Sequence, residues 1–430
     1  VDVVRLNFSH DVAEMHMKRA EAARERAAAH GRHVGVLVDL QGPKIRIGKF
    51  KNGPIRLAEG DKFTIDIDCP LDAGNQERVG TTYKPLIDDV SRGATLLLDD
   101  GRIVLWVDQV AGREVICRVV VGGELSNNKG INRQGGGLSA VALTDKDRVD
   151  MKTAAAMGAD YVAISFPRSA ADVEEARALL RAAGGHGGIV AKIERAEAVK
   201  AIEEIIAASD VLMVARGDLG VEIGDAAVPP VQKRIIKLAR QMNKVVITAT
   251  QMMESMIENP IPTRAEVSDV ANAVLDGTDA VMLSAETAKG KHPVAAVAAM
   301  DRVCKVAEEQ EEALLQERRA AHQDVERVDQ AIALASIYTA NNLGVKAIAA
   351  LTESGATTLW MSRIASNVPI YALTSHAETR RKVTLYRGVY PVAFQITTSD
   401  HATLNREALD ELRESWKDAS SFYQVFDPAR

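Results

Sequence analysis

The chain has 430 residues, enough for two to four domains, and its 47% hydrophobic and 26% charged residues are ordinary for a globular protein. Its formal net charge of −6 argues against general nucleic-acid binding, because a polyanion needs a basic surface. The three cysteines have no metal-like spacing, and no apolar run is long enough to cross a bilayer. We therefore expect no membrane partner and a reducing compartment, the cytosol.

Short apolar runs alternate with Ala-rich helical stretches along most of the chain. The predicted strands are 1–7, 34–39, 161–166, 189–194, 211–218, 245–251 and 280–286. The predicted helices are 11–29, 169–183, 195–208, 229–242, 263–275 and 293–316. Buried parallel strands are continuous apolar runs of this kind, so we expect an α/β fold, a (β/α)8 TIM barrel whose eighth strand precedes Val1. A doubly wound sheet would alternate in the same way, but no Gly-rich nucleotide fingerprint follows any strand.

Residues 43–139 interrupt this alternation. The segments 55–67, 94–107 and 114–121 are β-like, with Gly and Asp at the turns between them. We expect a small β-barrel inserted into a barrel loop, where it would act as a lid over the barrel mouth. Gly135, Gly136 and Gly137 would close the insertion as a flexible return.

A third region is predicted after the last barrel helix. A helix at 328–342, a strand at 347–351 and a strand at 370–373 indicate a small α/β domain. Its loop 352–358 either binds a phosphate on backbone amides or only begins a helix, and both interpretations stay open. The predicted division is 1–42 for the first part of the barrel, 43–139 for the lid, 140–315 for the rest of the barrel and 316–430 for the C-terminal domain.

All seven predicted strands end in polar residues, and barrel active sites lie at that end of the strands. Strand alternation points Lys192 and Glu194 to the same side. Glu194 and Asp218 could share one Mg²⁺, which typically takes one or two protein carboxylates and fills its other positions with substrate oxygens and water. The alternative is a purely structural ion pair between Lys192 and Glu194.

Two further strand ends suggest an anion site. Gly217 is expected to begin a short helix whose free amides bind a carboxylate, the alternative being a plain turn. Thr250 could hydrogen-bond a substrate or position a proton-donating water, the alternative being a core threonine.

Cations for phosphate binding are also present. Arg5 and Arg46 flank two strand ends, with Arg5 in an apolar strand, and Lys129 precedes the glycine-rich end of the insertion. Lys129 by itself could be surface charge. His10 follows a strand end, where a phosphate contact is a better interpretation than a catalytic base.

These motifs together resemble the pyruvate kinase family, of the bacterial type. The resemblance runs from Val1 to about Arg413 and rests on the segments 3–10, 39–46, 128–130, 191–194, 214–220, 249–256 and 262–266. It implies a barrel with an inserted lid and a C-terminal α/β domain, normally in a homotetramer. It also implies the last step of glycolysis, in which phosphoenolpyruvate and ADP give pyruvate and ATP with Mg²⁺ or Mn²⁺.

The resemblance assigns roles residue by residue. The implied catalytic residues are Lys192, Arg5 and Thr250, of which Lys192 faces the transferring phosphoryl group and stabilises the enolate. The implied metal ligands are Glu194 and Asp218. Phosphoenolpyruvate would contact Arg5, Lys192, Gly217, Asp218 and Thr250. The implied nucleotide contacts are Asn7, Phe8, Ser9, His10, Arg46 and Lys129. A K⁺ site would comprise Asn7, Ser9, Asp39 and the carbonyl of Leu40.

Three departures from the family pattern affect these expectations. The first barrel strand is missing, so we expect a fragment of a longer chain. Residues 414–430 resemble a helical, mixed tail instead of the family's last strands, which leaves the C-terminal domain incomplete and its tetramer assembly in doubt. Lys44 stands where family members that need K⁺ carry Glu. Its ammonium could replace the ion, so we expect activity without K⁺.

Two other functions compete with this interpretation. A Mg²⁺-dependent aldolase or lyase would also stabilise an enolate, but it has no second phosphate group for Arg46 and Lys129 to bind. A truncated, inactive chain that only binds partners is the other alternative. The complete set of site residues does not favour it.

Overall fold

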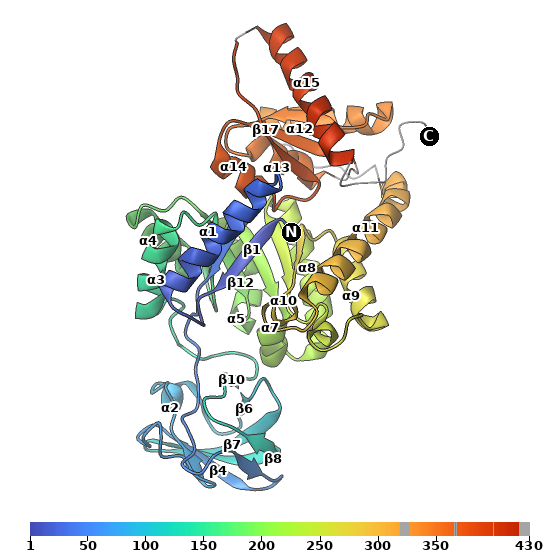
Figure 1. The fold of residues 1–430 in the computed structure, drawn as a ribbon. Helices are drawn as coiled ribbons and strands as arrows, with labels where there is room; N and C mark the ends of the chain where they lie inside the picture. Colours follow the sequence, from blue (N-terminus) through green and yellow to red (C-terminus); the bar gives the residue numbers. More distant parts are fainter. Residues whose placement is uncertain (319–326, 365, 367, 399, 421–430) are drawn as a thin grey trace.

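The structure, a computed structural model, describes residues 1–318, 327–364, 366, 368–398 and 400–420. Figure 1 shows three regions: a β-rich region at the bottom, a central α/β region and a smaller α/β region at the top. No helix in these described ranges combines the length and apolar character needed to cross a bilayer.

The central region is built on one curled, fully parallel sheet. Its strand order is β1-β2-β11-β12-β13-β14-β15. The strands are β1 (Val3–Asn7), β2 (Gly35–Asp39), β11 (Tyr161–Ile164), β12 (Gly188–Ile193), β13 (Val211–Ala215), β14 (Val245–Ala249) and β15 (Ala280–Met282). This confirms the TIM-like α/β fold from its continuous apolar strands. Within the described residues the sheet has seven strands, and β1 and β15 share no ladder.

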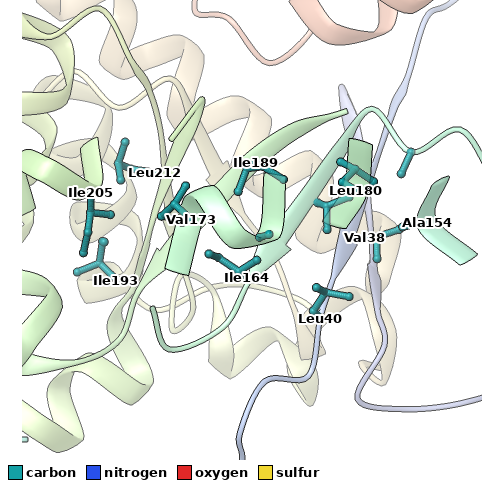
Figure 2. Packing of buried hydrophobic residues seen from close by; sticks show 14 of the residues in the cluster. Val38, Leu40, Ala154, Ile164, Val173, Leu180, Ile189, Ile193, Ile205 and Leu212 are labelled. Atoms are coloured by element: carbon teal, nitrogen blue, oxygen red, sulfur yellow. The ribbon is translucent and has the colours of Figure 1, made fainter. Parts of the chain in front are cut away.

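Helices cover the outside of this sheet. They are α1 (Ala13–Ala29), α3 (Asp145–Ala156), α4 (Ala170–Ala182), α5 (Ala196–Lys200), α6 (Ile202–Ala208), α7 (Arg216–Ile223), α8 (Val228–Gln241), α9 (Arg264–Leu275), α10 (Ala285–Ala288) and α11 (Pro293–Arg318). Thr144 and Thr263 form capping boxes that start α3 and α9. Figure 2 shows the core between helices and sheet, where Val173 and Leu180 of α4 pack near Ile164 and Ile189.

The single helix predicted over 195–208 is wrong, because the structure has two helices there. The backbone leaves helical geometry at Ala201 (φ −90°, ψ 19°) between α5 and α6. The chain then turns so that Ile202, Ile205 and Ile206 are all buried in the barrel core. Burial of these side chains, which local propensity does not encode, decides the break.

The β-rich region has its own sheets and its own core. Its strands are β3 (Ile55–Leu57), β4 (Lys62–Asp66), β5 (Arg78–Val79), β6 (Thr95–Leu98), β7 (Ile103–Ala111), β8 (Glu114–Val121), β9 (Gly123–Leu125) and β10 (Ile131–Arg133), with helix α2 (Leu86–Asp89). They form the orders β10-β6-β7-β8-β4-β5 and β3-β9. The segment 55–67, predicted to be β-like, contains two strands that belong to different sheets. A turn closed by Asp61 N–H and Ala58 O, with Gly60 at φ 87°, separates them.

The upper region contains a three-stranded parallel sheet, β16-β17-β18. Its elements are α12 (Val328–Leu343), β16 (Ile348–Leu351), α13 (Ala356–Arg363), β17 (Ile370–Thr374), α14 (Ala377–Val383), β18 (Val389–Ala393) and α15 (His401–Ser420). The predicted boundary between 315 and 316 falls inside α11, which continues to Arg318. The predicted tail 414–430 is helical to Ser420, and 421–430 lie outside the described residues. In loop 352–358, Gly355 N–H donates to Thr352 Oγ1 (3.0 Å) ahead of α13, and phosphate binding there stays a prediction.

A buried ion pair joins the barrel to the upper region. Arg363 of α13 and Asp279, just before β15, have side chains that are 1% and 0% exposed. Arg363 also donates to the carbonyl of Lys244 (2.8 Å), and Asp279 accepts from Val246 N–H (2.9 Å). Burial acts to raise the pKa of Asp279, but the facing Arg363 outweighs it and holds that pKa below its usual value.

We predict that Arg363→Met destabilises the chain by about 3–5 kcal/mol, because it leaves Asp279 charged, buried and without its cation. Urea denaturation followed by tryptophan fluorescence would measure this. Arg413→Met is the matched control, since its pair with Asp410 is exposed and should be worth about 0–1 kcal/mol. The double variant Asp279→Asn/Arg363→Met should recover part of the loss. A single variant as stable as the wild type would contradict this role for the pair.

Candidate functional site

A buried cluster of charges lies at the carboxyl ends of the barrel strands. Lys192 Nζ, on β12, is 2.9 Å from Glu194 Oε1 and 3.3 Å from Asp39 Oδ1. It also donates to Ser165 Oγ (2.8 Å). Arg5 of β1 reaches the other oxygen of Asp39, Oδ2, at 2.6 Å. Lys192 and Glu194 therefore face the same side, as the alternation of the strand predicts.

The charges of this cluster are not balanced, because its carboxylates outnumber its cations by one. Burial acts to lower the pKa of Lys192, but Asp39 and Glu194 outweigh it and raise that pKa, so the ammonium stays charged. Asp39 is 1% exposed; burial acts to raise its pKa, and Lys192 and Arg5 hold it below its usual value. Burial raises the pKa of Glu194 to about 7, with a further contribution from Asp218 and opposition from Lys192. Two cations thus face three carboxylates.

The two predicted metal ligands fit a divalent cation. Glu194 is 1% exposed, with Oε1 beside Lys192 and Oε2 accepting from Phe166 N–H (2.8 Å). Asp218 lies in the first turn of α7 and interacts electrostatically with Glu194. The described residues contain no group of three or more His, Cys, Asp or Glu side chains that could hold a metal. A metal on these two carboxylates would therefore need oxygens from substrate and water, as Mg²⁺ typically does.

The predicted anion-binding residues Gly217 and Thr250 also come together. Gly217 N–H donates to Thr250 Oγ1 (2.9 Å), so this amide already has a partner. Thr250 has φ 67°, and Gln251 has φ 55°, which is uncommon for residues with side chains, above all for a β-branched one. Arg216, which the sequence analysis missed, holds this bend by donating to Thr250 O (2.6 Å) and pairing with Asp269 (2.7 Å).

The predicted nucleotide contacts in the loop after β1 differ in how far their side chains are exposed. Ser9 N–H donates to the side chain of Asn7 (3.1 Å), and His10 is exposed. The Phe8 ring is 2% exposed and stacks on His16, with ring centroids 4.3 Å apart. Only the backbone of Phe8 can therefore face a nucleotide. His16, another residue that sequence reasoning missed, is hydrogen-bonded to the carbonyl of His10 (2.8 Å).

The predicted potassium ligands lie close to one another, because Asn7 is the register partner of Asp39 and Ser9 N–H donates to the side chain of Asn7. Asp39 Oδ1 is buried and accepts no hydrogen bond, although Lys192 is near, so it has a free lone pair for a cation. The carbonyl of Leu40 accepts from Ser165 Oγ (2.8 Å). Lys44 is exposed and has no ion pair with Asp39 among the described contacts; it lines a small cavity with Asp218. Replacement of K⁺ by Lys44 stays a prediction.

Arg46 and Lys129 lie on adjoining segments at the barrel end of the β-rich region. Arg46 forms a β-bridge with Gly130, and its guanidinium donates to Asn128 O (2.7 Å). Lys129 pairs with Asp99 (2.7 Å), so its charge is partly neutralised in this conformation. The structure thus brings these two predicted phosphate contacts together, on a different region from Arg5.

A further buried carboxylate, Glu222 of α7, lies beside the connection to the β-rich region. It is 4% exposed, and its Oε2 accepts from Ala196 N–H (2.9 Å). Its backbone carbonyl accepts from Gly135 N–H (2.8 Å). Burial raises the pKa of Glu222 to about 7, and repulsion from Glu197 adds to the rise.

Comparisons with known proteins assign the family. A family model described as the pyruvate kinase barrel domain matches residues 1–297, and one described as the pyruvate kinase alpha/beta domain matches residues 330–421. The chain is 55% identical to pyruvate kinase II of Salmonella typhimurium, over 96% of this chain and 86% of the relative. It is also 55% identical to pyruvate kinase of Haemophilus influenzae, over 91% and 82%. A solved pyruvate kinase from Cryptosporidium parvum matches with TM-score 0.90 at 35% identity, over 96% and 86%.

We predict that Glu222 makes the free energy of unfolding fall as pH rises from about 4.5 to about 7. In this window the folded state keeps a proton that the unfolded state has released. The free energy of unfolding therefore falls by up to about 1.4 kcal/mol per pH unit. Glu222→Gln should flatten the slope when denaturation is measured at several pH values without Mg²⁺. Glu258→Gln, at an exposed carboxylate, should leave it unchanged. An unaltered slope in Glu222→Gln would refute the assignment.

Proposed function

Because this chain belongs to the pyruvate kinase family, we propose that the buried cluster around Lys192 carries out the reaction of that family. The chain is a phosphotransferase that converts phosphoenolpyruvate and ADP into pyruvate and ATP, the last step of glycolysis. The observation that carries the site assignment is the position of one charged ammonium, Lys192, between Asp39 and Glu194 at the carboxyl end of β12.

In the proposed mechanism, phosphoenolpyruvate binds across the carboxyl ends of the barrel strands. Arg5 contacts its phosphoryl group, and the α7 amides of Gly217 and Asp218 receive its carboxylate with Thr250. The Gly217 amide would exchange the hydroxyl of Thr250 for the substrate oxygen. The Thr250 hydroxyl, which donates to the carbonyl of Ala249 (2.6 Å), would turn its hydrogen to the substrate carboxylate or to a water. Glu194 and Asp218 would hold Mg²⁺ or Mn²⁺, which neutralises phosphoryl and enolate charge when bound.

Lys192 supplies the electrostatic stabilisation in this proposal. As the phosphorus–oxygen bond breaks, negative charge develops on the enolate oxygen of the leaving pyruvate. An ammonium already fixed by Asp39 and Glu194 needs little reorganisation to stabilise that charge. Protonation at C3 then gives pyruvate, and a water positioned by Thr250 is the proposed proton donor.

The nucleotide would approach from the β-rich region. Arg46 and Lys129 are the proposed cations for its phosphates, with Asn7, Ser9 and His10 on the barrel side. Lys129, whose side chain is 33% exposed, would leave the largely buried Asp99 for a phosphate oxygen. A homotetramer and a cytosolic location are further proposals, and they rest on the family resemblance alone.

Two rival functions make different predictions. Family membership and two phosphate-binding cations on the β-rich region oppose an aldolase or lyase, whose reaction would not depend on ADP. An inactive chain would show no ADP-dependent pyruvate formation at any Mg²⁺ concentration. A coupled assay for pyruvate, run with and without ADP and with and without a chelator of Mg²⁺, separates all three.

We predict that Lys192→Met lowers kcat by about 10²–10³ while KM for phosphoenolpyruvate changes only slightly. The proposed interaction strengthens as charge develops in the transition state, so binding should suffer less than turnover. Steady-state kinetics would show the split, with Lys233→Met as the control at an exposed lysine. A defect confined to KM would be incompatible with this role.

We also predict that turnover does not require K⁺, because the ammonium of Lys44 takes over its electrostatic role. The assay would use a buffer free of Na⁺ and K⁺, with a bulky organic cation at fixed ionic strength. Lys44→Glu should create a K⁺ requirement, whereas Lys51→Glu, an exposed charge reversal on the same region, should not. Strong activation of the wild type by added K⁺ would end this hypothesis.

A further inference from the structure

The two connections between the barrel and the β-rich region meet at one pair of side chains, the buried Arg195 and the half-buried Phe166. The Arg195 guanidinium lies over the Phe166 ring, 5.5 Å from its centroid. Arg195 is 4% exposed and directly follows the proposed metal ligand Glu194. A buried arginine needs acceptors for its N–H groups, so its partners reveal what it holds in place.

Arg195 holds the returning connection, residues 134–140. Its Nη1 donates to the carbonyls of Leu138 (3.2 Å) and Ala140 (3.3 Å), both of which are buried residues. Gly137 N–H donates to Glu197 in the same place. One guanidinium thus fixes two carbonyls of the segment that brings the chain back from the β-rich region.

The outgoing connection packs against the same point. Gly42 has φ +66°, and a Cβ there would lie 2.7 Å from Ser165 Cβ and 3.3 Å from Phe166 Cδ2. Only glycine fits such a close approach. Its N–H donates to Asp147 Oδ1 (3.1 Å), which ties it to α3. The outgoing connection therefore contacts the end of β11 directly, and the returning connection reaches it through Arg195.

The same residues also hold the catalytic cluster. Phe166 adopts φ 58°, and its backbone N–H donates to Glu194 Oε2 (2.8 Å). Its neighbour Ser165 bonds Lys192 Nζ and the carbonyl of Leu40. A continuous set of contacts thus runs from Glu194 through the Phe166 backbone and ring to Arg195 and the returning connection.

We propose that Arg195 is a positioning residue that sets the β-rich region at the distance required for phosphoryl transfer from the barrel. It would act through the returning connection, so that a nucleotide on Arg46 and Lys129 meets a phosphoryl group at Lys192. This inference rests on the proposed function. Arg195 itself contacts neither substrate in this proposal. The step that takes place in the barrel alone, proton exchange at C3 of pyruvate, should therefore not need Arg195.

The test compares Arg195→Ala with the wild type on two reactions. In the complete reaction, KM for ADP should rise and kcat should fall, each by about tenfold or more, since small misplacements of reactants are costly. Exchange of the C3 protons of pyruvate with solvent, which needs only the barrel, should stay within about threefold, as should KM for phosphoenolpyruvate. Amide hydrogen exchange of residues 134–142 should become faster.

Matched variants separate this role from general damage. Arg24 of α1 also donates to two backbone carbonyls, those of Met157 (2.7 Å) and Gly158 (2.6 Å), but it lies away from the β-rich region. Arg24→Ala should leave the ADP and exchange measurements unchanged. Arg195→Lys keeps the charge with a single donor group and should rescue the defect partly. If circular dichroism shows that Arg195→Ala is unfolded, the same measurements on Arg195→Lys decide whether Arg195 has this role.

Two results would overturn the inference. Loss of proton exchange, or of Mn²⁺ affinity measured by electron paramagnetic resonance, in proportion to kcat would mean that Arg195 acts on Glu194. An unchanged KM for ADP would mean that the returning connection needs no such support. A wild type that neither turns over phosphoenolpyruvate with ADP nor exchanges pyruvate protons would instead refute the proposed function. Hydrogen exchange at 134–142 would then still report whether Arg195 holds the connection.

Discussion

The charge balance around Lys192 is the constraint on which the rest of the site depends. A buried ammonium is stable there only because Asp39 and Glu194 face it, and those carboxylates are stable only because Lys192 and Arg5 face them. Desolvation by the barrel wall makes each interaction strong, and it makes any uncompensated charge costly. Asp218 adds a negative charge at the rim. We propose that a further cation and an anionic substrate complete the cluster.

Much of this arrangement could be predicted from local sequence patterns. Continuous apolar runs predicted all seven barrel strands, and the two-residue period of β12 predicted that Lys192 and Glu194 face one side. The polar strand ends predicted the edge of the sheet at which the buried charges lie together. The roles of individual residues in substrate and ion binding came from family resemblance, and they stay predictions.

Other features depend on contacts between distant parts of the chain and leave no local pattern. Ser165 matters because it joins Lys192 to the carbonyl of Leu40, a residue that lies 125 positions before Ser165 in the chain. The amide of Phe166 reaches Glu194 only because the backbone takes a left-handed φ, which no motif marks. Arg216 resembles any helix-start arginine until its carbonyl partners are seen. The break at Ala201 likewise follows from core packing.

The meeting of both connections at Phe166 has a consequence for how the β-rich region can move. Two tethers that pass through one point leave rotation about that point as the easiest motion, because a translation would stretch both. Displacement in such a rotation grows with distance from the pivot. Arg46 lies only a few residues after the outgoing connection, and Lys129 lies only a few residues before the returning one. The hairpin β7–β8, in contrast, lies at the far end of the β-rich region. The far end can therefore sweep widely while Arg46 and Lys129, the proposed phosphate contacts, remain almost stationary.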